Sequence, residues 1–238
     1  MALGLIFPLY IYPAPTSWDP VYVSLKTNPN TPHILIINPC SGPGTALDAN
    51  YTAALTQLRR YPNAMLIGYV STAWGKRDTD VVRADIKQWA LWDVDGVFLD
   101  ECSTGVKESD VYRDYKAFVS ELWDDGVVVI NPGTPPNPVY LLPDISTICI
   151  LCENSYKEWT QFRPPVRSSS CGLILHSTPT WAKEELDNVI RDVVADGYQW
   201  IFLTDDPMPN PYDAFPGYWE EIGRAVAKCG GVDEGWCG

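Results

Sequence analysis

The sequence predicts a single (β/α)8 barrel, the TIM-barrel fold, with eight parallel strands. Its 238 residues are close to the roughly 250 that such a barrel needs. Eight short apolar runs follow one another along the chain, and helical patterns lie between most of them. An open nucleotide-binding sheet is disfavoured because the turn after the first run, residues 13–20, contains no glycine.

The eight apolar runs are almost continuously hydrophobic, which is typical of parallel strands that are covered by helices. They are rich in β-branched and aromatic residues, so we interpret each as one strand of the barrel. In order they are Gly4–Tyr12, His33–Asn38, Ala64–Val70, Gly96–Glu101, Gly126–Asn131, Thr147–Glu153, Gly172–Ser177 and Gln199–Thr204.

Five connections show apolar residues at helical spacing. Ser109 is the expected N-cap of the third of these helices. The connections after the first, fifth and sixth runs are shorter and less regular, and the proline-rich fifth has room for only a turn of helix. The expected helices are Asp48–Arg60, Thr79–Trp92, Ser109–Trp123, Thr180–Ala195 and Asp213–Lys228.

We assign residues 1–228 to the barrel and residues 229–238 to a short tail that contains glycine and cysteine. The start of the chain does not read as a signal peptide, because it lacks a basic segment and contains Pro8. The sequence therefore predicts a cytoplasmic protein if Met1 is the native start. No run reaches the ~20 apolar residues of a membrane span.

The chain is acidic, with a formal net charge of −13. We see no lysine or arginine cluster, so nucleic acid is not an expected partner. A carbohydrate or a small-molecule substrate is expected instead, bound by a monomer.

No metal or other cofactor is expected. Cys149 and Cys152 form a C-x-x-C pair, but it lies inside an apolar strand, where residues three apart point to opposite faces. His33 and His176 are the only histidines. Cys229 and Cys237 flank a glycine-rich segment, and whether they form a disulfide stays open.

Each apolar run ends in residues that can hydrogen-bond or ionise. In a barrel of this kind, reactive groups lie at the carboxyl ends of the strands. These end positions hold Tyr10, Tyr12, Asn38, Tyr69, Thr72, Asp100, Glu101, Asn131, Glu153, Asn154, His176, Ser177, Thr204, Asp205 and Asp206.

Five of these residues are carboxylates that would face the same mouth of the barrel. Crowded carboxylates shift one another's pKa, so one can stay protonated while another ionises, as glycosidic bond cleavage requires. Of Asp100 and Glu101 only one can point straight into the barrel, because neighbouring strand residues alternate. The alternative interpretation is that these carboxylates cap helices or pair with Arg77 and Lys107.

Other residues near the strand ends are candidates for substrate binding. Arg77 follows the third run and could orient a carboxylate. Trp74 and Trp159 fall in expected loops at the same mouth and could stack on a sugar ring. The loop Asn38–Gly44 is either a simple turn or part of the cleft wall. His176 is expected to be a supporting residue, and no serine-nucleophile motif is present.

Several segments of the sequence together resemble the spherulin-4 family, also called spherulation-specific family 4. The resemblance runs almost end to end. It implies a barrel similar to glycoside hydrolases that act on galactosamine-containing fungal polysaccharides, with Asp100, Glu101 and Glu153 as the acidic site. It also implies a secreted or cell-surface protein. The matching segments are Pro8–Pro13, Ile36–Gly44, Ile67–Thr72, Asp95–Glu101, Cys152–Tyr156 and Thr204–Trp219.

The first hypothesis is therefore a glycoside hydrolase for an α-1,4-linked, galactosamine-containing polysaccharide. Asp100 and Glu153 would act as general acid and as nucleophile or base, in an order left open, and Glu101 would tune them. The expected substrate-binding residues are Tyr10, Tyr12, Asn38, Tyr69, Trp74, Arg77, Asn131, Asn154, Trp159, Asp205 and Asp206.

Two alternatives stay open. The first is an intracellular biosynthetic enzyme, a cyclase, isomerase or lyase, that uses the same carboxylates on a small molecule. It is favoured by the lack of an export signal and by Cys40, where the family loop usually carries asparagine. The second is a non-catalytic, glycan-binding protein of the cell surface.

Overall fold

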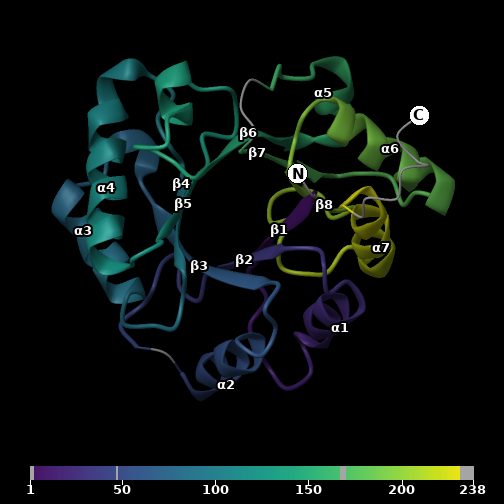
Figure 1. The fold of residues 1–238 in the computed structure, drawn as a ribbon, viewed down its shortest axis with the longest axis horizontal. Coiled ribbons are helices and arrows are strands. Elements are labelled where there is room, and N and C mark those ends of the chain that lie inside the picture. Colours follow the sequence, from purple (N-terminus) through teal and green to yellow (C-terminus); the bar gives the residue numbers. More distant parts are fainter. Residues whose placement is uncertain (1–2, 47, 167–169, 231–238) are drawn as a thin grey trace.

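The structure is a computed structural model that describes residues 3–46, 48–166 and 170–230. Met1, Cys237 and residues 231–238 of the expected tail lie outside the described residues. Eight parallel strands pair in chain order and close into one barrel (Figure 1), which confirms the predicted fold. The strands are β1 Gly4–Leu9, β2 His33–Ile37, β3 Ala64–Ser71, β4 Gly96–Asp100, β5 Val127–Ile130, β6 Ile148–Ser155, β7 Cys171–His176 and β8 Trp200–Leu203.

Helices surround the barrel on its outside (Figure 1). The α-helices are α1 Asp19–Thr27, α2 Ala49–Leu58, α3 Thr79–Trp89, α4 Ser109–Leu122, α5 Tyr156–Gln161, α6 Lys183–Ala195 and α7 Trp219–Gly230. The short 3-10 helices are η1 Ala73–Gly75, η2 Val106–Glu108 and η3 Pro138–Leu141.

Three expectations about the helices need correction. The first connection holds a regular helix, α1, with Pro20 in its first turn, where proline costs no hydrogen bond. Ser109 is the first residue of α4 rather than its cap, and its hydroxyl donates to the carbonyl of Val106. α6 and α7 begin later than predicted. The N–H of Ala182 donates to Glu185 at the start of α6, and Pro216 lies just before α7.

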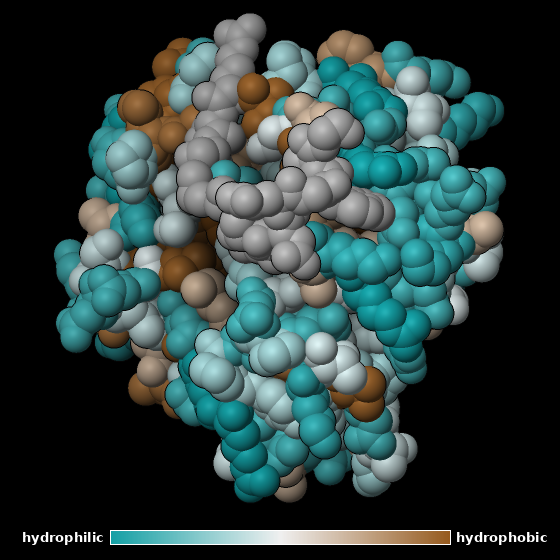
Figure 2. All heavy atoms as spheres, turned by 45° about the vertical axis from the view of Figure 1, so that its right-hand side comes forward, coloured by the Kyte–Doolittle hydropathy of each residue, from teal (hydrophilic) through white to brown (hydrophobic). Residues whose placement is uncertain are grey.

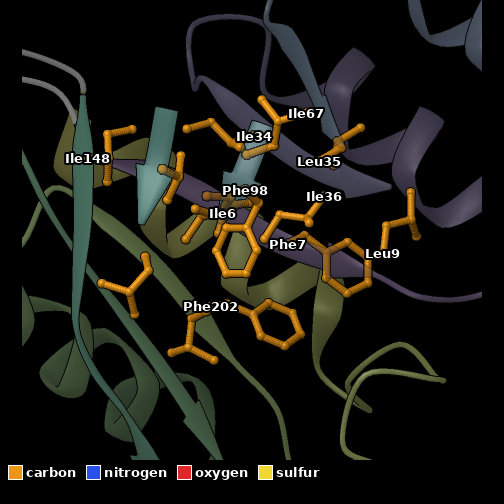
Figure 3. Packing of buried hydrophobic residues seen from close by; sticks show 14 of the residues in the cluster. Ile6, Phe7, Leu9, Ile34, Leu35, Ile36, Ile67, Phe98, Ile148 and Phe202 are labelled. Carbon is orange, nitrogen blue, oxygen red and sulfur yellow. The ribbon is translucent and has the colours of Figure 1, made fainter. Parts of the chain in front are cut away.

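The inside of the barrel is filled by hydrophobic side chains. The register pairs Tyr69 with Phe98, Phe98 with Val129, and Val129 with Ile148, so these residues share one face of the sheet. Figure 3 shows the cluster of buried residues to which Phe98 and Ile148 belong. Since this core closes the barrel, any substrate must bind above it, at the carboxyl ends of the strands.

A β-bulge in β6 decides which side chain faces the barrel axis. β6 and β7 pair Ile150 with Gly172 and then Cys152 with Leu173, so Leu151 is an extra residue. The bulge reverses the alternation of side chains along the strand. As a result Glu153, rather than Cys152, points inward.

The same bulge corrects the prediction that Cys149 and Cys152 point to opposite faces. Both point to the outer layer: Cys149 lines a depression with Lys116 of α4, and Cys152 lines another with Phe162. Over the described ranges, no group of three or more histidine, cysteine or acidic residues is placed to hold a metal. Among the described helices, none is long and apolar enough to cross a bilayer.

Candidate active site

Asn131, at the end of β5, lies between the two carboxylates that the sequence singled out. Its side-chain nitrogen donates to Oδ1 of Asp100 at 2.8 Å and to Oε2 of Glu153. Its side-chain oxygen accepts the N–H of Gly133, which supports this orientation of the amide. Two oxygens that accept from one nitrogen are at most about 6 Å apart. β4, β5 and β6 thus bring Asp100 and Glu153 together.

Each of the two carboxylates also accepts a hydrogen bond from a different tyrosine. Tyr69, from β3, hydrogen-bonds to Asp100, and Tyr212, from the β8–α7 connection, donates to Oε1 of Glu153. The ring of Tyr10 lies between them and packs edge-on against both, at 5.7 Å in each case. Burial, together with the nearby carboxylates, raises the pKa of all three phenols, so they remain protonated donors.

Asp100 is the carboxyl group whose environment favours a proton. Burial, and next the charge of Glu153, raise its pKa to about 6, although hydrogen bonds from Tyr69 and Asn131 act in the opposite direction. A carboxyl group with this pKa is substantially protonated in mildly acidic solution and can act as a general acid.

Glu101 reaches the site through an unusual backbone conformation. Its φ of 52° lies in the left-handed region, which is costly for a residue with a side chain. The hydroxyl of Thr72 and the N–H of Trp74 both donate to its carbonyl, at 2.9 and 2.6 Å. Its carboxylate accepts from the hydroxyl of Ser71 at 2.6 Å, and Ser71 pairs with Asp100 in the register. The left-handed turn therefore directs Glu101 toward the inward-facing Ser71.

The family model of spherulation-specific family 4 matches residues 4–226. This chain belongs to that family. Spherulin-4 from Physarum polycephalum is 31% identical over 218 residues, which cover 85% of this chain and 63% of the relative. The chain therefore spans less than two thirds of that relative's length.

One solved structure supports the same assignment, and a second shares the fold. The crystal structure of Aspergillus clavatus Sph3 in complex with GalNAc has a TM-score of 0.87 and 29% identity, and the match covers 95% of this chain and 98% of that one. An endoglucanase from Bacteroides salanitronis has a TM-score of 0.53 at 9% identity, covering 97% and 93% of the two chains. That second likeness shows the barrel fold alone.

Asp205 and Asp206, the other two predicted carboxylates, have neighbours of their own. Asp205 accepts the N–H of Gly217 at 3.0 Å. Burial, followed by the charges of Asp205 and Asp213, raises the pKa of Asp206. Over the described residues no hydrogen bond joins Asp205 or Asp206 to the Asp100–Glu153 pair.

Several predicted binding residues instead hold loops in place. Tyr12, which is exposed, donates to Asp48 at 2.7 Å. Asn38 accepts the N–H of Gly42 within its own turn. Arg77 pairs with Asp85 at 2.6 Å and donates to the carbonyl of Ser71, so the carboxylate that it orients is Asp85 of α3.

Asn154 does not share the site with Glu153. The two residues are neighbours on β6 and point to opposite faces, and Asn154 lines the outer depression beside Cys152 and Phe162. Among the described ion pairs, none involves Asp100, Glu101 or Glu153, so the alternative in which Arg77 and Lys107 neutralise them finds no support.

The two tryptophans proposed for sugar stacking differ in how far their side chains are exposed. Trp74 lies in η1 directly after β3 and is 56% exposed. Trp159 lies in α5 and is 1% exposed, under the guanidinium of Arg163 at 4.2 Å. The prediction for Trp159 is wrong because the segment after β6 folds as a helix that buries this ring.

Sequence reasoning missed Ser71 and Tyr212. His176 continues the inward face of β7. Its pKa is lowered by burial, while Glu153 and Glu158 act in the opposite direction. Tyr212 lies within the Thr204–Trp219 segment that carries the family resemblance, which was the available signal. Tyr212 lies well beyond the end of β8 in the sequence, so its contact with Glu153 could not be predicted from the strand ends.

Hydrophilic side chains cover much of the face shown in Figure 2.

Proposed function

We propose that this protein is a glycoside hydrolase that cleaves an α-1,4-linked polysaccharide containing galactosamine. The observation that carries the proposal is the pair of carboxylates, Asp100 and Glu153, held by one amide nitrogen at the carboxyl ends of the strands. The sugar class is supported by the similarity to Sph3, whose structure contains GalNAc.

Asp100 and Glu153 together can carry out the proton transfers and the bond cleavage that hydrolysis of a glycosidic linkage requires. One carboxylic acid gives its proton to the bridging oxygen as the bond from that oxygen to C1 breaks. The other, as a carboxylate, either bonds to C1 or takes a proton from the water that does so. In the covalent route, water then supplies the hydroxyl on C1 and its proton returns to the acid. In the direct route, the base holds the proton of water until it is released to solvent and the acid is reprotonated.

The spacing of the pair favours a retaining route. Retaining enzymes hold the two carboxyl groups about 5–5.5 Å apart, and inverting enzymes about 6.5–9.5 Å apart. The shared donor limits the accepting oxygens of Asp100 and Glu153 to about 6 Å. This leaves little space for the water that an inverting enzyme places opposite the leaving group.

Surrounding residues support binding of a sugar chain. Tyr10 and Tyr69 offer ring surfaces beside the carboxylates, and exposed Trp74 offers a stacking face next to β3. The net charge of −13 suits a partly deacetylated, cationic polysaccharide. We assign Tyr12, Asn38, Asp205 and Asp206 to the loops that surround this surface.

The test is incubation with partly deacetylated α-1,4-galactosaminan and mass spectrometry of the products. We expect oligosaccharides from the wild type and from Glu121→Gln, an exposed glutamate on α4, and none from Glu153→Gln with an unchanged thermal unfolding curve. Full activity of Glu153→Gln would reject the assignment. Binding without products from the wild type would favour a glycan-binding protein, and neither binding nor products would favour a small-molecule enzyme.

A further inference from the structure

The hydroxyl of Tyr10 has no hydrogen-bond partner among the residues that the structure describes. Its neighbours differ in this respect, because Tyr69 hydrogen-bonds to Asp100 and Tyr212 donates to Glu153. The ring of Tyr10 packs edge-on against both of these tyrosines, at 5.7 Å in each case. Of these three phenols, two therefore hold the carboxylates, and the third has its proton available for a bound ligand.

The barrel register directs Tyr10 toward the two carboxylates. It pairs Pro8 of β1 with Ile36, and Ile36 with Ile67 of β3. Tyr69 lies two residues after Ile67 on the inward face. Tyr10 lies two residues after Pro8, so it continues the same face. Burial, together with the nearby carboxylates, raises the pKa of this phenol, so it remains a donor.

The position of Tyr10 limits the sugar atoms that it can reach. In the reaction proposed above, on which this inference rests, C1 of the sugar lies between Asp100 and Glu153. A donor beside both carboxylates faces the bridging oxygen, the ring oxygen and the substituent on C2. The bridging oxygen receives the proton of the carboxylic acid. The ring oxygen becomes positive in the transition state, so a donor to it would oppose the reaction. The substituent on C2 is the remaining acceptor.

The charge of the site decides which substituent on C2 is suitable. The polysaccharide offers either an acetamido group, whose carbonyl oxygen accepts a hydrogen bond, or an ammonium group, which can only donate. An ammonium group beside Asp100 and Glu153 would favour the ionised form of both, whereas the reaction needs one of them protonated. The acetamido group avoids this conflict and provides an acceptor for the Tyr10 hydroxyl.

We propose that Tyr10 is a specificity-determining residue whose hydroxyl donates to the acetamido carbonyl on C2 of the sugar that is cleaved at C1. The requirement for an acetyl group applies to this sugar alone, since the acidic protein can bind ammonium groups on sugars farther along the chain. A site built around one donor discriminates against an analogue without the matching acceptor, because the donor is then left unpaired.

The composition of the products tests the proposal. Partly deacetylated α-1,4-galactosaminan is first reduced with borohydride, so that borodeuteride after hydrolysis labels only the new reducing ends for mass spectrometry. We expect acetylated sugars at nearly all labelled ends from the wild type. Tyr10→Phe keeps the ring but should lower kcat/KM about tenfold and raise the share of deacetylated ends. Frequent deacetylated ends from the wild type, or an unchanged share in Tyr10→Phe, would overturn the proposal.

Binding measurements separate this proposal from the proposed function. N-acetylgalactosamine and galactosamine are titrated into the wild type and into Tyr10→Phe and followed by NMR. We expect the variant to bind N-acetylgalactosamine about 3- to 10-fold more weakly and galactosamine as weakly as the wild type does. Equal losses for both sugars, or no preference in the wild type, would overturn the proposal. The expected preference in a wild type without hydrolase activity would reject the proposed function and retain the role of Tyr10.

Tyr140→Phe is the matched control, because the hydroxyl of Tyr140 donates to the carbonyl of Gly105 at 2.9 Å. The control should lower Tm by about 2–4 °C and leave binding and products unchanged. Tyr10→Phe should show the reverse pattern, with a Tm within about 1 °C of the wild type, because its hydroxyl has no protein partner to lose. A fall in Tm as large as that of the control would assign the Tyr10 hydroxyl a structural role instead.

Discussion

Asp100 and Glu153 accept hydrogen bonds from the same nitrogen, Nδ2 of Asn131. The two acids come from β4 and β6, and the amide comes from β5 between them. The arrangement follows from strand order in the barrel: each of the three neighbouring strands contributes one inward side chain at its carboxyl end. The separation of the two acids thus depends on a third residue that has no charge of its own.

We expect Asn131→Asp to reduce kcat by about 100- to 1,000-fold or more, because it removes the shared donor and adds a third negative charge. Steady-state kinetics with a thermal unfolding curve is the measurement. Asn137→Asp is the matched control, since Asn137 accepts the N–H of Val139 with its side-chain oxygen and aspartate can do the same. Equal activity of the two variants would show that the bridge has no catalytic role.

The stability of the protein should depend on pH through Asp100. Its pKa in the folded state, about 6, lies above the usual 3.8, so the folded state holds a proton that the unfolded state has lost. The contribution of the protonated group is therefore fully present below about pH 4 and is lost as the pH rises through about 6.

Asp100→Asn removes this titration. Relative to the wild type, the variant should gain about 1–1.5 kcal/mol of unfolding free energy between pH 5 and pH 7.5. Urea unfolding of both proteins at the two pH values measures this gain. A difference that is constant with pH would contradict the raised pKa, whatever the activity of the variant.

Replacing Glu101 by glycine should change the stability and the activity of the protein in opposite directions. Glycine adopts a φ of 52° without steric cost, so Glu101→Gly should stabilise the fold by about 0.5–1 kcal/mol while lowering kcat about tenfold. Glu101→Gln is the control, because it keeps the left-handed backbone and should leave stability near that of the wild type. A destabilised Glu101→Gly variant would mean that the hydrogen bond to Ser71 outweighs the backbone cost.

The two tryptophans should respond oppositely to alanine substitution. Trp74→Ala should raise KM for the polysaccharide about tenfold and leave the unfolding curve almost unchanged, because the ring is exposed. Trp159→Ala should lower stability by about 3–5 kcal/mol, because it opens a cavity beneath Arg163. Phe162→Ala serves as the control for an exposed aromatic ring, directly after α5. An unchanged KM in Trp74→Ala would remove this residue from the substrate-binding surface.

Local sequence patterns were sufficient to predict the barrel fold and the types of residue at the carboxyl ends of its strands. Continuous apolar runs identify parallel strands, and parallel strands place their carboxyl ends at one rim, so Asp100, Asn131 and Glu153 could be expected there from the sequence. Predictions failed where a side chain depends on its neighbours in space. Trp159 follows a strand end in the sequence, but the packing of α5 buries its ring.

The sequence by itself determined the number and order of the strands and the chemical types of residue at their ends. Only the tertiary structure decided which of those residues meet. The bulge at Leu151 points Glu153 inward, the left-handed turn at Glu101 brings its carboxylate to Ser71, and the β8–α7 connection places Tyr212 against Glu153. Each depends on register or backbone geometry set by segments distant along the chain, and the hydrophobic pattern of a single strand carries no information about such contacts.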